Sequence, residues 1–330
     1  MVIAQLGAGR IGAMHAAILV RILDGGDLVV ADVDPERAHA VAADVGARAE
    51  DPAVAIAGAD ALVIAASSAA HPELIRAGMA RGIPVFCEKP LAVDLDETRR
   101  LTEEIESSGI RFQLGFQRRF DEGYREARRL VESGEIGTLY VVRLAGHDPA
   151  PPHEAYIPQS GGIFNDFSVH DFDVARWLTG QEFEEVYADG GVLGFEVFAK
   201  YGDVDTAVAT FRLSRGTRAI LSATRHDPLG YDIRTELFGS KDSVSVGLGP
   251  RTPMRSVEPG VPPPAGPAWS AFQNRFADAY ENELRAFLRV ARGEEESACT
   301  ARDGLEAVRV AVAARRSLDE HRPVRVAEVM

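Results

Sequence analysis

An aspartate and a histidine at helical spacing are the side chains of this sequence best suited to acid–base chemistry. Asp166 and His170 lie four residues apart between Gly161 and Asp173, so on a helix they share one face. A carboxylate beside an imidazole stabilises the imidazolium and fixes its orientation, which suits a general acid and base near neutral pH. The alternatives are an ordinary surface ion pair and a metal site that includes Asp173. We expect Asp171, about a quarter turn off this face, to point to solvent.

A lysine follows a short apolar segment in the run Cys87-Glu88-Lys89-Pro90. Residues just past the carboxyl end of a strand in a doubly wound sheet line its ligand crevice. If Pro84–Phe86 is such a strand, the Lys89 ammonium can stabilise negative charge that develops on a reacting oxygen. The alternative is that Lys89 is an ordinary solvated charge on the surface.

The segment Gly7-Ala8-Gly9-Arg10-Ile11-Gly12 fits the pattern G-x-G-x-x-G between an apolar run and a helical pattern. In a dinucleotide-binding turn, Gly7 allows the tight turn, Gly9 lets the backbone approach a pyrophosphate, and Gly12 permits close helix–strand packing. The helix N-terminus at Arg10 then offers N–H groups and partial positive charge to the phosphates. We therefore predict that this segment binds a dinucleotide.

Asp32 ends the next apolar run, 20 residues after Gly12. An acidic side chain at this place accepts hydrogen bonds from the adenosine ribose, and its charge repels a 2′-phosphate. The predicted cofactor is therefore NAD rather than NADP. Arg10 and Arg37 leave NADP open, because either guanidinium could reach a 2′-phosphate.

The elements that must position these residues alternate over residues 1–118 between short apolar runs and amphipathic segments. Such alternation indicates βαβ units and a parallel sheet with helices on both faces, a doubly wound Rossmann domain. The expected strands are Val2–Leu6, Leu28–Ala31, Ala61–Ala65, Pro84–Phe86 and Phe112–Leu114, and the expected helices are Arg10–Leu23, Pro35–Asp44, Pro72–Ala80 and Leu95–Ser107.

Residues 119–330 have a different pattern, with apolar residues at every second position of several segments. We expect an α+β domain with a large, mainly antiparallel sheet and helices on one face. The expected strands are Leu139–Leu144, Thr206–Leu213, Thr217–Thr224, Tyr231–Phe238 and Ser243–Val246, and the expected helices are Phe120–Ser133 and Phe164–Leu178. Seven of the 18 prolines fall between Pro250 and Pro267, which predicts a long surface loop before two amphipathic helices.

Composition restricts the class of protein. The chain has 330 residues, 46% of them apolar and 26% charged, a globular balance that fits two domains. With 36 Lys and Arg against 50 Asp and Glu the formal charge is −14, which disfavours nucleic acid and anionic membranes as partners. Two cysteines make no disulfide framework, and no apolar run is long enough to span a membrane. We expect a cytoplasmic protein.

Three motifs in this order, GAGRIG at Gly7–Gly12, CEKPLA at Cys87–Ala92 and GGIFNDFSVHDFDVARWL at Gly161–Leu178, resemble the Gfo/Idh/MocA family of NAD(P)-dependent oxidoreductases. The resemblance runs over essentially the whole chain. It is closest to the inositol 2-dehydrogenase branch, on the stretches Gly115–Asp121, His147–Ile157 and Gly230–Asp232.

The resemblance implies roles for individual residues. Lys89, Asp166 and His170 match the catalytic group of the family, and Glu88 matches the acidic residue beside the cofactor. Ser67 and His71 lie in the loop that touches the nicotinamide ribose in relatives. Residues that match contacts to substrate hydroxyls are Gln117, Arg118, Asp148 and Tyr231. The sequence departs from the pattern at Ala66-Ser67, at Gln117 and at His147, which leaves the substrate open.

The resemblance implies a dehydrogenase that oxidises a secondary hydroxyl of a cyclic polyol such as myo-inositol, with no metal. The alternatives are the same chemistry on an aldose, an amino-sugar, an amino-inositol or a nucleotide-linked sugar, a dinucleotide-binding sensor without activity, and a metal hydrolase that uses Asp166, His170 and Asp173. By analogy with the family we expect a homo-oligomer, a dimer or a homotetramer, whose ligand is a small neutral polyol or sugar.

Overall fold

The computed structural model describes residues 1–329, which form two compact units. The first unit comprises Met1–Phe120 together with Asp278–Leu305, and the second comprises Asp121–Ala277 together with the segment that begins at Glu306. The division expected from the sequence, at residue 118, differs from this one because residues 278–305 belong to the first unit.

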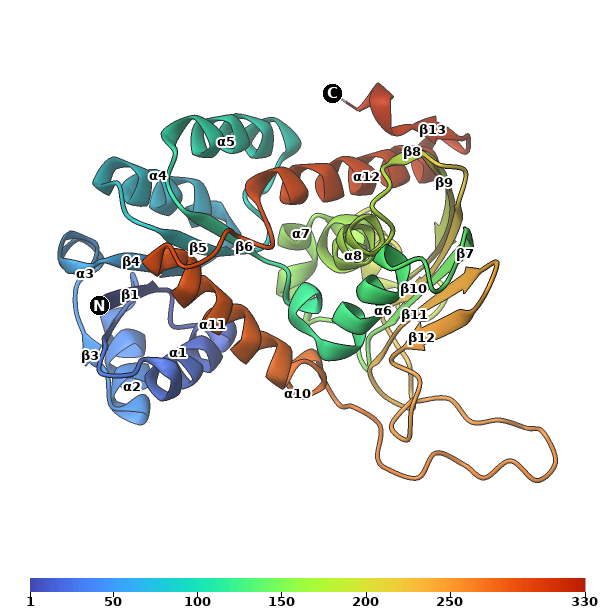
Figure 1. The fold of residues 1–330 in the computed structure, drawn as a ribbon, viewed down its shortest axis with the longest axis horizontal. Helices are drawn as coiled ribbons and strands as arrows, with labels where there is room; N and C mark the ends of the chain where they lie inside the picture. The colour runs from blue at the N-terminus through green and yellow to red at the C-terminus, as the bar shows by residue number, and fades with distance from the viewer. Residues whose placement is uncertain (330) are drawn as a thin grey trace. The chain divides into compact units, whose positions relative to one another are not determined.

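The first unit is built on a six-stranded parallel sheet (Figure 1). Its order, β3-β2-β1-β4-β5-β6, is that of the doubly wound dinucleotide-binding fold. The central strands are buried on both faces, which explains their continuous apolar sequence. The strands are β1 Val2–Leu6, β2 Asp27–Ala31, β3 Arg48–Ala49, β4 Ala61–Ile64, β5 Val85–Glu88 and β6 Phe112–Gly115.

Acidic caps begin several helices of this unit. The side chain of Asp34 accepts hydrogen bonds from the amides of Glu36 and Arg37, and Asp94 accepts one from the amide of Glu97. The α-helices are α1 Arg10–Ile22, α2 Pro35–Val45, α3 Pro52–Gly58, α4 His71–Arg81 and α5 Leu95–Ser108, with 3-10 turns η1 Ser68–Ala70 and η2 Gln117–Phe120. The sequence predicted four of the five helices, and it missed α3 and the two-residue strand β3.

The first unit also contains α11, Ala277–Arg292, which comes from the far end of the chain. The ring of Phe287 lies 5.7 Å from that of Phe86 on β5, and Gln113 Nε2 of β6 donates a 3.0 Å hydrogen bond to the carbonyl of Glu283. Beyond the helix, the carbonyl of Cys299 accepts from the amide of Leu114 at 3.0 Å. The helix is therefore part of this unit's core.

The second unit contains a seven-stranded mixed sheet in the order β12-β11-β7-β10-β9-β8-β13. All neighbours pair antiparallel except β7 and β10, so the expectation of a mainly antiparallel sheet is confirmed. The strands are β7 Leu139–His147, β8 Phe183–Gly191, β9 Thr206–Leu213, β10 Arg218–Thr224, β11 Asp232–Gly239, β12 Ser243–Val246 and β13 Val324–Arg325. Strand β8 was not predicted from the sequence.

Helices cover one face of this sheet (Figure 1). On the covered face, Phe172, Phe183 and Phe211 pack edge to face with ring centroids 5.0–6.0 Å apart. On the open face, Val208 and Ile220 are about half exposed. The helices of the second unit are α6 Glu122–Glu132, α7 Ile157–Ser160, α8 Val169–Thr179, α9 Val197–Lys200, α10 Phe272–Arg275 and, from Glu306 onward, α12 Ala301–Glu320, with shorter turns η3 Glu154–Tyr156, η4 Ile163–Ser168 and η5 Val326–Glu328.

The proline-rich segment between β12 and α10 contains no regular element, as predicted (Figure 1). Arg251 anchors it at two points: its guanidinium lies 3.5 Å from the ring centroid of Trp269, and its Nε donates to the carbonyl of Pro267. Within residues 1–329, no helix combines the length and the apolar character needed to cross a membrane.

Candidate active site

The glycine segment forms the turn between β1 and α1. Gly7 has φ of +104°, and a Cβ there would lie 2.4 Å from the carbonyl oxygen of Ala65. A Cβ on Gly12 would lie 2.1 Å from the carbonyl oxygen of Gly7, so both positions require glycine. A Cβ on Gly9 would meet nothing within 4 Å. This open space at the N-cap of α1, beside helix amides, fits the pyrophosphate of a dinucleotide.

Asp32 follows β2 and is hydrogen-bonded within the same turn. Its Oδ2 accepts from the amide of Ala8 at 2.7 Å, its Oδ1 accepts from the amide of Asp34 at 2.9 Å, and Arg37 Nη1 lies 3.7 Å from Oδ1. The carboxylate therefore fixes the glycine turn, a structural role that the sequence did not predict. Contact between Asp32 and a ribose stays a prediction, compatible with the lone pairs that remain on its oxygens.

The Glu88-Lys89-Pro90 corner begins at the last residue of β5, at the carboxyl edge of the sheet, where Lys89 was predicted. The peptide bond between Lys89 and Pro90 is cis. Glu88 Oε1 lies 2.6 Å from Nε2 of His15 on α1, and the carbonyl of Pro90 lies 2.7 Å from Nδ1 of His71 on α4. Glu88 and Lys89 are half-buried at this edge.

The remaining predicted residues of the first unit lie at the same edge of the sheet. Ser67 follows β4 and is exposed, whereas His71 is 1% exposed and contacts two backbone carbonyls. A contact between His71 and the cofactor ribose stays a prediction. Gln117 and Arg118 lie on η2, directly after β6, and are buried.

In the second unit, a buried arginine joins two of the predicted carboxylates. Arg225 Nη2 lies 3.1 Å from Asp166 Oδ2, and Arg225 Nη1 lies 3.6 Å from Asp148 Oδ2. The hydroxyl of Tyr156 donates to Asp166 Oδ1 at 2.8 Å. Burial opposes charge on Arg225, but the Asp166, Asp148 and Asp203 carboxylates raise its pKa, so the guanidinium stays charged. Asp148 and Asp166 are thus brought together.

No role was predicted from the sequence for Arg225 or Tyr156. Arg225 directly follows β10, and its position one residue past the predicted strand Thr217–Thr224 is the only sequence signal that could have pointed to it. Tyr156 lies in the stretch that carries the family resemblance, but the spacing of the sequence does not connect it with Asp166.

The helix that carries Asp166 and His170 is wound in two ways. Residues Ile163–Ser168 form a π-turn, η4, and α8 continues from Val169. The expected helix is therefore present, but Asp166 lies on the wide turn and His170 on the α-helical part. The amide of Ile163 donates to Asp203 Oδ1 at 3.2 Å, which ties the start of the turn. Insertions of this kind are frequent at functional sites.

Asp171 and Asp173 do not face solvent. Asp171 is fully buried, so the expectation that it points to solvent is wrong, and Asp173 is 1% exposed. The reason is the packing of α8 against the sheet, where a Cβ on Gly146 of β7 would lie 3.3 Å from Asp171 Oδ2. Because α8 packs against both β7 and α6, it buries more than one of its faces.

Tyr231, the last predicted substrate residue, precedes β11 and is 6% exposed. Its amide donates to the carbonyl of Trp269 at 2.7 Å, and its ring lies edge-on to Phe276. The preceding Gly230 has φ of +141°, and a Cβ there would lie 2.7 Å from the Cβ of Ala268. The end of the proline-rich segment therefore holds Tyr231 in place.

Among residues 1–329, one cluster has ligand atoms close enough for a metal ion. These atoms of His147, Asp227 and Asp232 lie within 4.8 Å of one another. Burial raises the pKa of Asp232, but its contacts with His147 and with Arg234 lower it further, so the carboxylate is charged. Arg234 binds both oxygens of Asp232, at 2.8 and 3.0 Å. The guanidinium already neutralises this carboxylate, which argues against a metal in its place.

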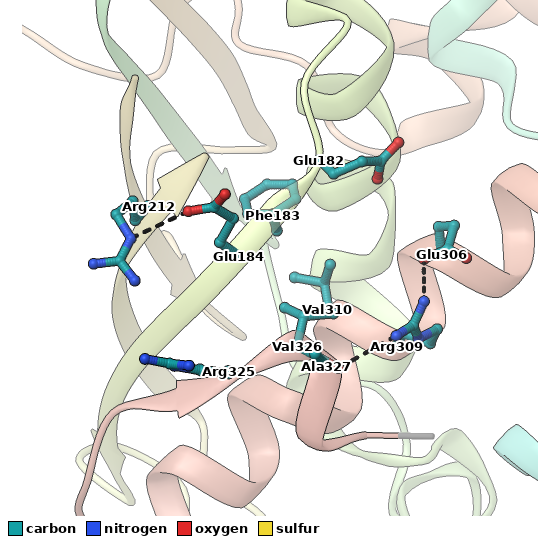
Figure 2. A pocket seen from close by; sticks show the side chains of 10 residues that line it. All are labelled: Glu182, Phe183, Glu184, Arg212, Glu306, Arg309, Val310, Arg325, Val326 and Ala327. Atoms are coloured by element: carbon teal, nitrogen blue, oxygen red, sulfur yellow. Dashed lines mark hydrogen bonds and ion pairs between the residues drawn. The ribbon is translucent and has the colours of Figure 1, made fainter. Parts of the chain in front are cut away.

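A cavity of about 490 Å³ lies in the second unit, away from every predicted site residue. Figure 2 shows its side chains, which come from the start of β8, from β9, from α12 and from the segment after it. Three glutamates and three arginines line it, with Arg212 3.3 Å from Glu184 and Arg309 2.8 Å from Glu306. Because these charges cancel, the cavity offers no field for an anionic cofactor.

Comparison with known proteins identifies the family. Residues 1–116 match the model of the oxidoreductase family with an NAD-binding Rossmann fold, and residues 124–245 match the GFO/IDH/MocA C-terminal domain. The chain is 40% identical to the myo-inositol dehydrogenase Hyg17 of Streptomyces leeuwenhoekii, over 96% of this chain and 97% of that protein. It is 37% identical to the myo-inositol 2-dehydrogenase of Thermotoga maritima over the whole of both chains.

Solved structures agree with these sequence matches. The crystal structure of a probable dehydrogenase from Thermotoga maritima superposes with a TM-score of 0.92 at 36% identity, over all of both chains. The scyllo-inositol dehydrogenase from Lactobacillus casei with bound NAD(H) and scyllo-inositol has a TM-score of 0.89 at 30% identity, over 99% of each chain. The chain therefore belongs to the Gfo/Idh/MocA family of NAD-dependent oxidoreductases.

Proposed function

We propose that this protein is an inositol dehydrogenase, which oxidises a secondary hydroxyl of inositol to the ketone with NAD. The main support is the solved relative from Lactobacillus casei, which binds NAD(H) and scyllo-inositol and covers 99% of this chain. The glycine turn with its open Gly9 gives the same conclusion for the cofactor from the chain's own geometry.

The cofactor is held by the turn at Gly7–Gly12, by Asp32 and by the loops that contain Ser67 and Glu88. When bound, NAD supplies the hydride acceptor for the reaction. The carboxylate of Asp32 repels a 2′-phosphate, which favours NAD over NADP.

His170 acts as the general base that removes the hydroxyl proton, and as the general acid in the reverse direction. Asp166 orients the imidazole and accepts a hydrogen bond from a neighbouring hydroxyl. Lys89 binds the reacting oxygen, where its positive charge stabilises the alkoxide that develops as the proton leaves.

The substrate is held by polar groups with both donor and acceptor capacity, as a polyol requires. We propose Gln117 and Arg118 as donors, and Asp148 and Tyr231 as further partners. Arg225 lies between Asp148 and Asp166 and pairs with both carboxylates, and an ionised carboxylate only accepts hydrogen bonds. Such carboxylates suit a neutral ligand rich in hydroxyl donors.

The test is a panel of substrates assayed through the NADH absorbance band. Myo-inositol, scyllo-inositol, an amino-inositol and several aldoses are each offered with NAD and with NADP. We expect turnover with an inositol and NAD. Turnover with an aldose alone would reassign the substrate, and binding of NAD without turnover on any of them would indicate a sensor.

A variant of the base makes the same test specific to the site. His170→Asn removes the proton acceptor and is expected to lower kcat on the order of 10²–10⁴-fold, with little change in the Kd of NAD. His321→Asn is the matched control, because His321 is exposed at φ of +52°, a conformation that asparagine tolerates. Wild-type turnover in the His170 variant would remove His170 from the mechanism.

We also propose that the protein is a homo-oligomer, a dimer or tetramer, in a reducing cytoplasm. The open face of the large sheet carries half-exposed Tyr187, Val208 and Ile220, which a second copy would cover. Cys87 and Cys299 are buried and are not joined in a disulfide, as a reducing compartment favours. Light scattering gives the mass in solution, and a monomer would contradict the first of these proposals.

A further inference from the structure

Two buried histidines hold the corner that carries Lys89, one on each side of it. We propose that His15 and His71 are positioning residues, which fix Lys89 by binding the Glu88 side chain and the Pro90 carbonyl. The inference rests on the proposed role of Lys89 in catalysis. It gives His71 a different role from the cofactor contact that the resemblance implied.

His15 holds the corner from α1. It is fully buried, with its Nε2 2.6 Å from Glu88 Oε1. Phe86 and Tyr280 pack against the imidazole with ring centroids 5.7 and 5.8 Å away, so the ring cannot turn freely. Nδ1 has no hydrogen-bond partner within the described residues. Because a carboxylate accepts, Nε2 must carry the proton, and His15 donates to Glu88.

His71 holds the corner from α4. Its Nδ1 lies 2.7 Å from the Pro90 carbonyl and its Nε2 lies 3.2 Å from the Ala66 carbonyl. Burial lowers the pKa of His71 below its ordinary 6.5, against the effect of both carbonyls and of Glu88, while Lys89 lowers it further. The ring is therefore neutral at neutral pH and has one N–H. The shorter contact places that proton on Nδ1, which donates to Pro90.

These contacts determine where the Lys89 side chain begins. The residue before it is fixed through its carboxylate and the residue after it through its carbonyl, so the Lys89 backbone has little freedom. Ala66 belongs to the segment against which Gly7 packs, where a Cβ on Gly7 would lie 2.5 Å from the amide nitrogen of Ala66. His71 therefore lies between the lysine corner, to which it donates its one N–H, and the segment beside the glycine turn. A misplacement of about 1 Å at a reacting group can cost about 10²-fold in rate.

Substitution by asparagine or by glutamine distinguishes the roles of the two imidazole nitrogens. An asparagine amide takes the place of Nδ1, and a glutamine amide takes the place of Nε2. We expect His71→Asn and His15→Gln, which keep the Pro90 and Glu88 contacts, to retain near wild-type kcat. We expect His71→Gln and His15→Asn to lose about 10- to 100-fold in kcat, with the Kd of NAD unchanged. All four variants are compared with wild type on the best substrate of the panel.

A second measurement does not depend on turnover. Acetylation of Lys89 in the protein without cofactor, followed by mass spectrometry, reports the environment of its amine. We expect wild-type rates in His71→Asn and His15→Gln, and rates changed several-fold in His71→Gln and His15→Asn. This readout stands even if the wild-type protein fails to oxidise any inositol, which would contradict the proposed function and not the positioning role.

Two results would overturn the proposal. Equal loss of kcat and equal acetylation rates in both variants at each position would mean that the histidines merely fill space. A weaker Kd for NAD with unchanged kcat in the His71 variants would assign His71 to the cofactor instead.

Discussion

At the scale of single residues, the polar site of the second unit depends on Arg225. Its side chain is buried, and it faces Asp166 at 3.1 Å and Asp148 at 3.6 Å. Two carboxylates so close to one another repel unless a cation lies between them. Removal of one partner from a buried ion pair leaves an uncompensated charge, which costs more than the net value of the pair itself.

We therefore expect Arg225→Met to lower the free energy of unfolding by about 3–5 kcal/mol. Arg218→Met, at the exposed start of the same strand, is the matched control and should stay within about 1 kcal/mol of wild type. The double variant Arg225→Met, Asp166→Asn should recover part of the loss, because it removes one of the two carboxylates that Arg225 faces. Additive effects of the two substitutions in urea unfolding would show that Arg225 does not compensate Asp166.

At the scale of elements, the sequence predicted what depends on local pattern. Buried strands such as Ala61–Ile64 read as apolar runs, and the amphipathic segment Leu95–Ser107 predicted α5. The π-turn η4 could not be predicted, because apolar spacing does not separate 3.6 residues per turn from the wider winding. The parallel pairing of β7 with β10 was missed for another reason: it joins strands that are far apart in the chain.

The residues of the candidate site also fall into those that local sequence pattern predicted and those that it did not. Gly7, Gly12 and Lys89 were recognised because each follows a predicted strand, where a doubly wound sheet places its ligands. The contacts of Arg225 and of His15 were not, because each connects residues more than 50 positions apart. A pattern within one segment carries no information about such pairs.

The turn between β1 and α1 gives a prediction that separates folding from binding. Gly9→Ala adds a Cβ that meets no protein atom within 4 Å, so the melting temperature should stay at or slightly above that of wild type. The same Cβ fills the space through which the pyrophosphate approaches, so the Kd of NAD should rise on the order of tenfold. Titration of NAD by protein fluorescence and thermal unfolding measure the two effects.

Gly12→Ala is the complementary variant. Its Cβ would lie 2.1 Å from the Gly7 carbonyl oxygen, so helix and strand must move apart, at a cost of about 1–3 kcal/mol in stability. If Gly9→Ala bound NAD like wild type, the open space at Gly9 would not be the approach of the pyrophosphate.

At the scale of the whole molecule, the chain order and the compact units do not coincide. The last helix of the first unit lies in residues 278–305, which follow most of the second unit in the sequence. Hydrophobic periodicity predicted that helix but could not say which sheet it covers. Tyr280, Leu284 and Phe287 of α11 are buried. Tyr280 packs against His15, and Phe287 packs against Phe86. The unit's core therefore needs both segments.

This arrangement predicts how fragments of the protein fold. A fragment of residues 1–120 lacks α11, and burial of each large apolar side chain contributes about 1.5–3 kcal/mol. Loss of several such side chains removes much of the roughly 5–15 kcal/mol that stabilises a domain. We expect this fragment to unfold without cooperativity and to bind no NAD. Residues 1–120 joined by a flexible linker to residues 278–305 should unfold cooperatively and bind NAD, as followed by circular dichroism and NAD titration.

A third fragment controls for the added length. The same linked fragment with Phe287→Asp keeps the helix but places a charge against Phe86, whose ring lies 5.7 Å from that of Phe287. It should behave like residues 1–120 alone, because an unpaired carboxylate is too costly to bury. If residues 1–120 alone folded and bound NAD, α11 would be an addition to a complete domain. The packing of α11 would then not be needed for the first unit to fold or for NAD to bind.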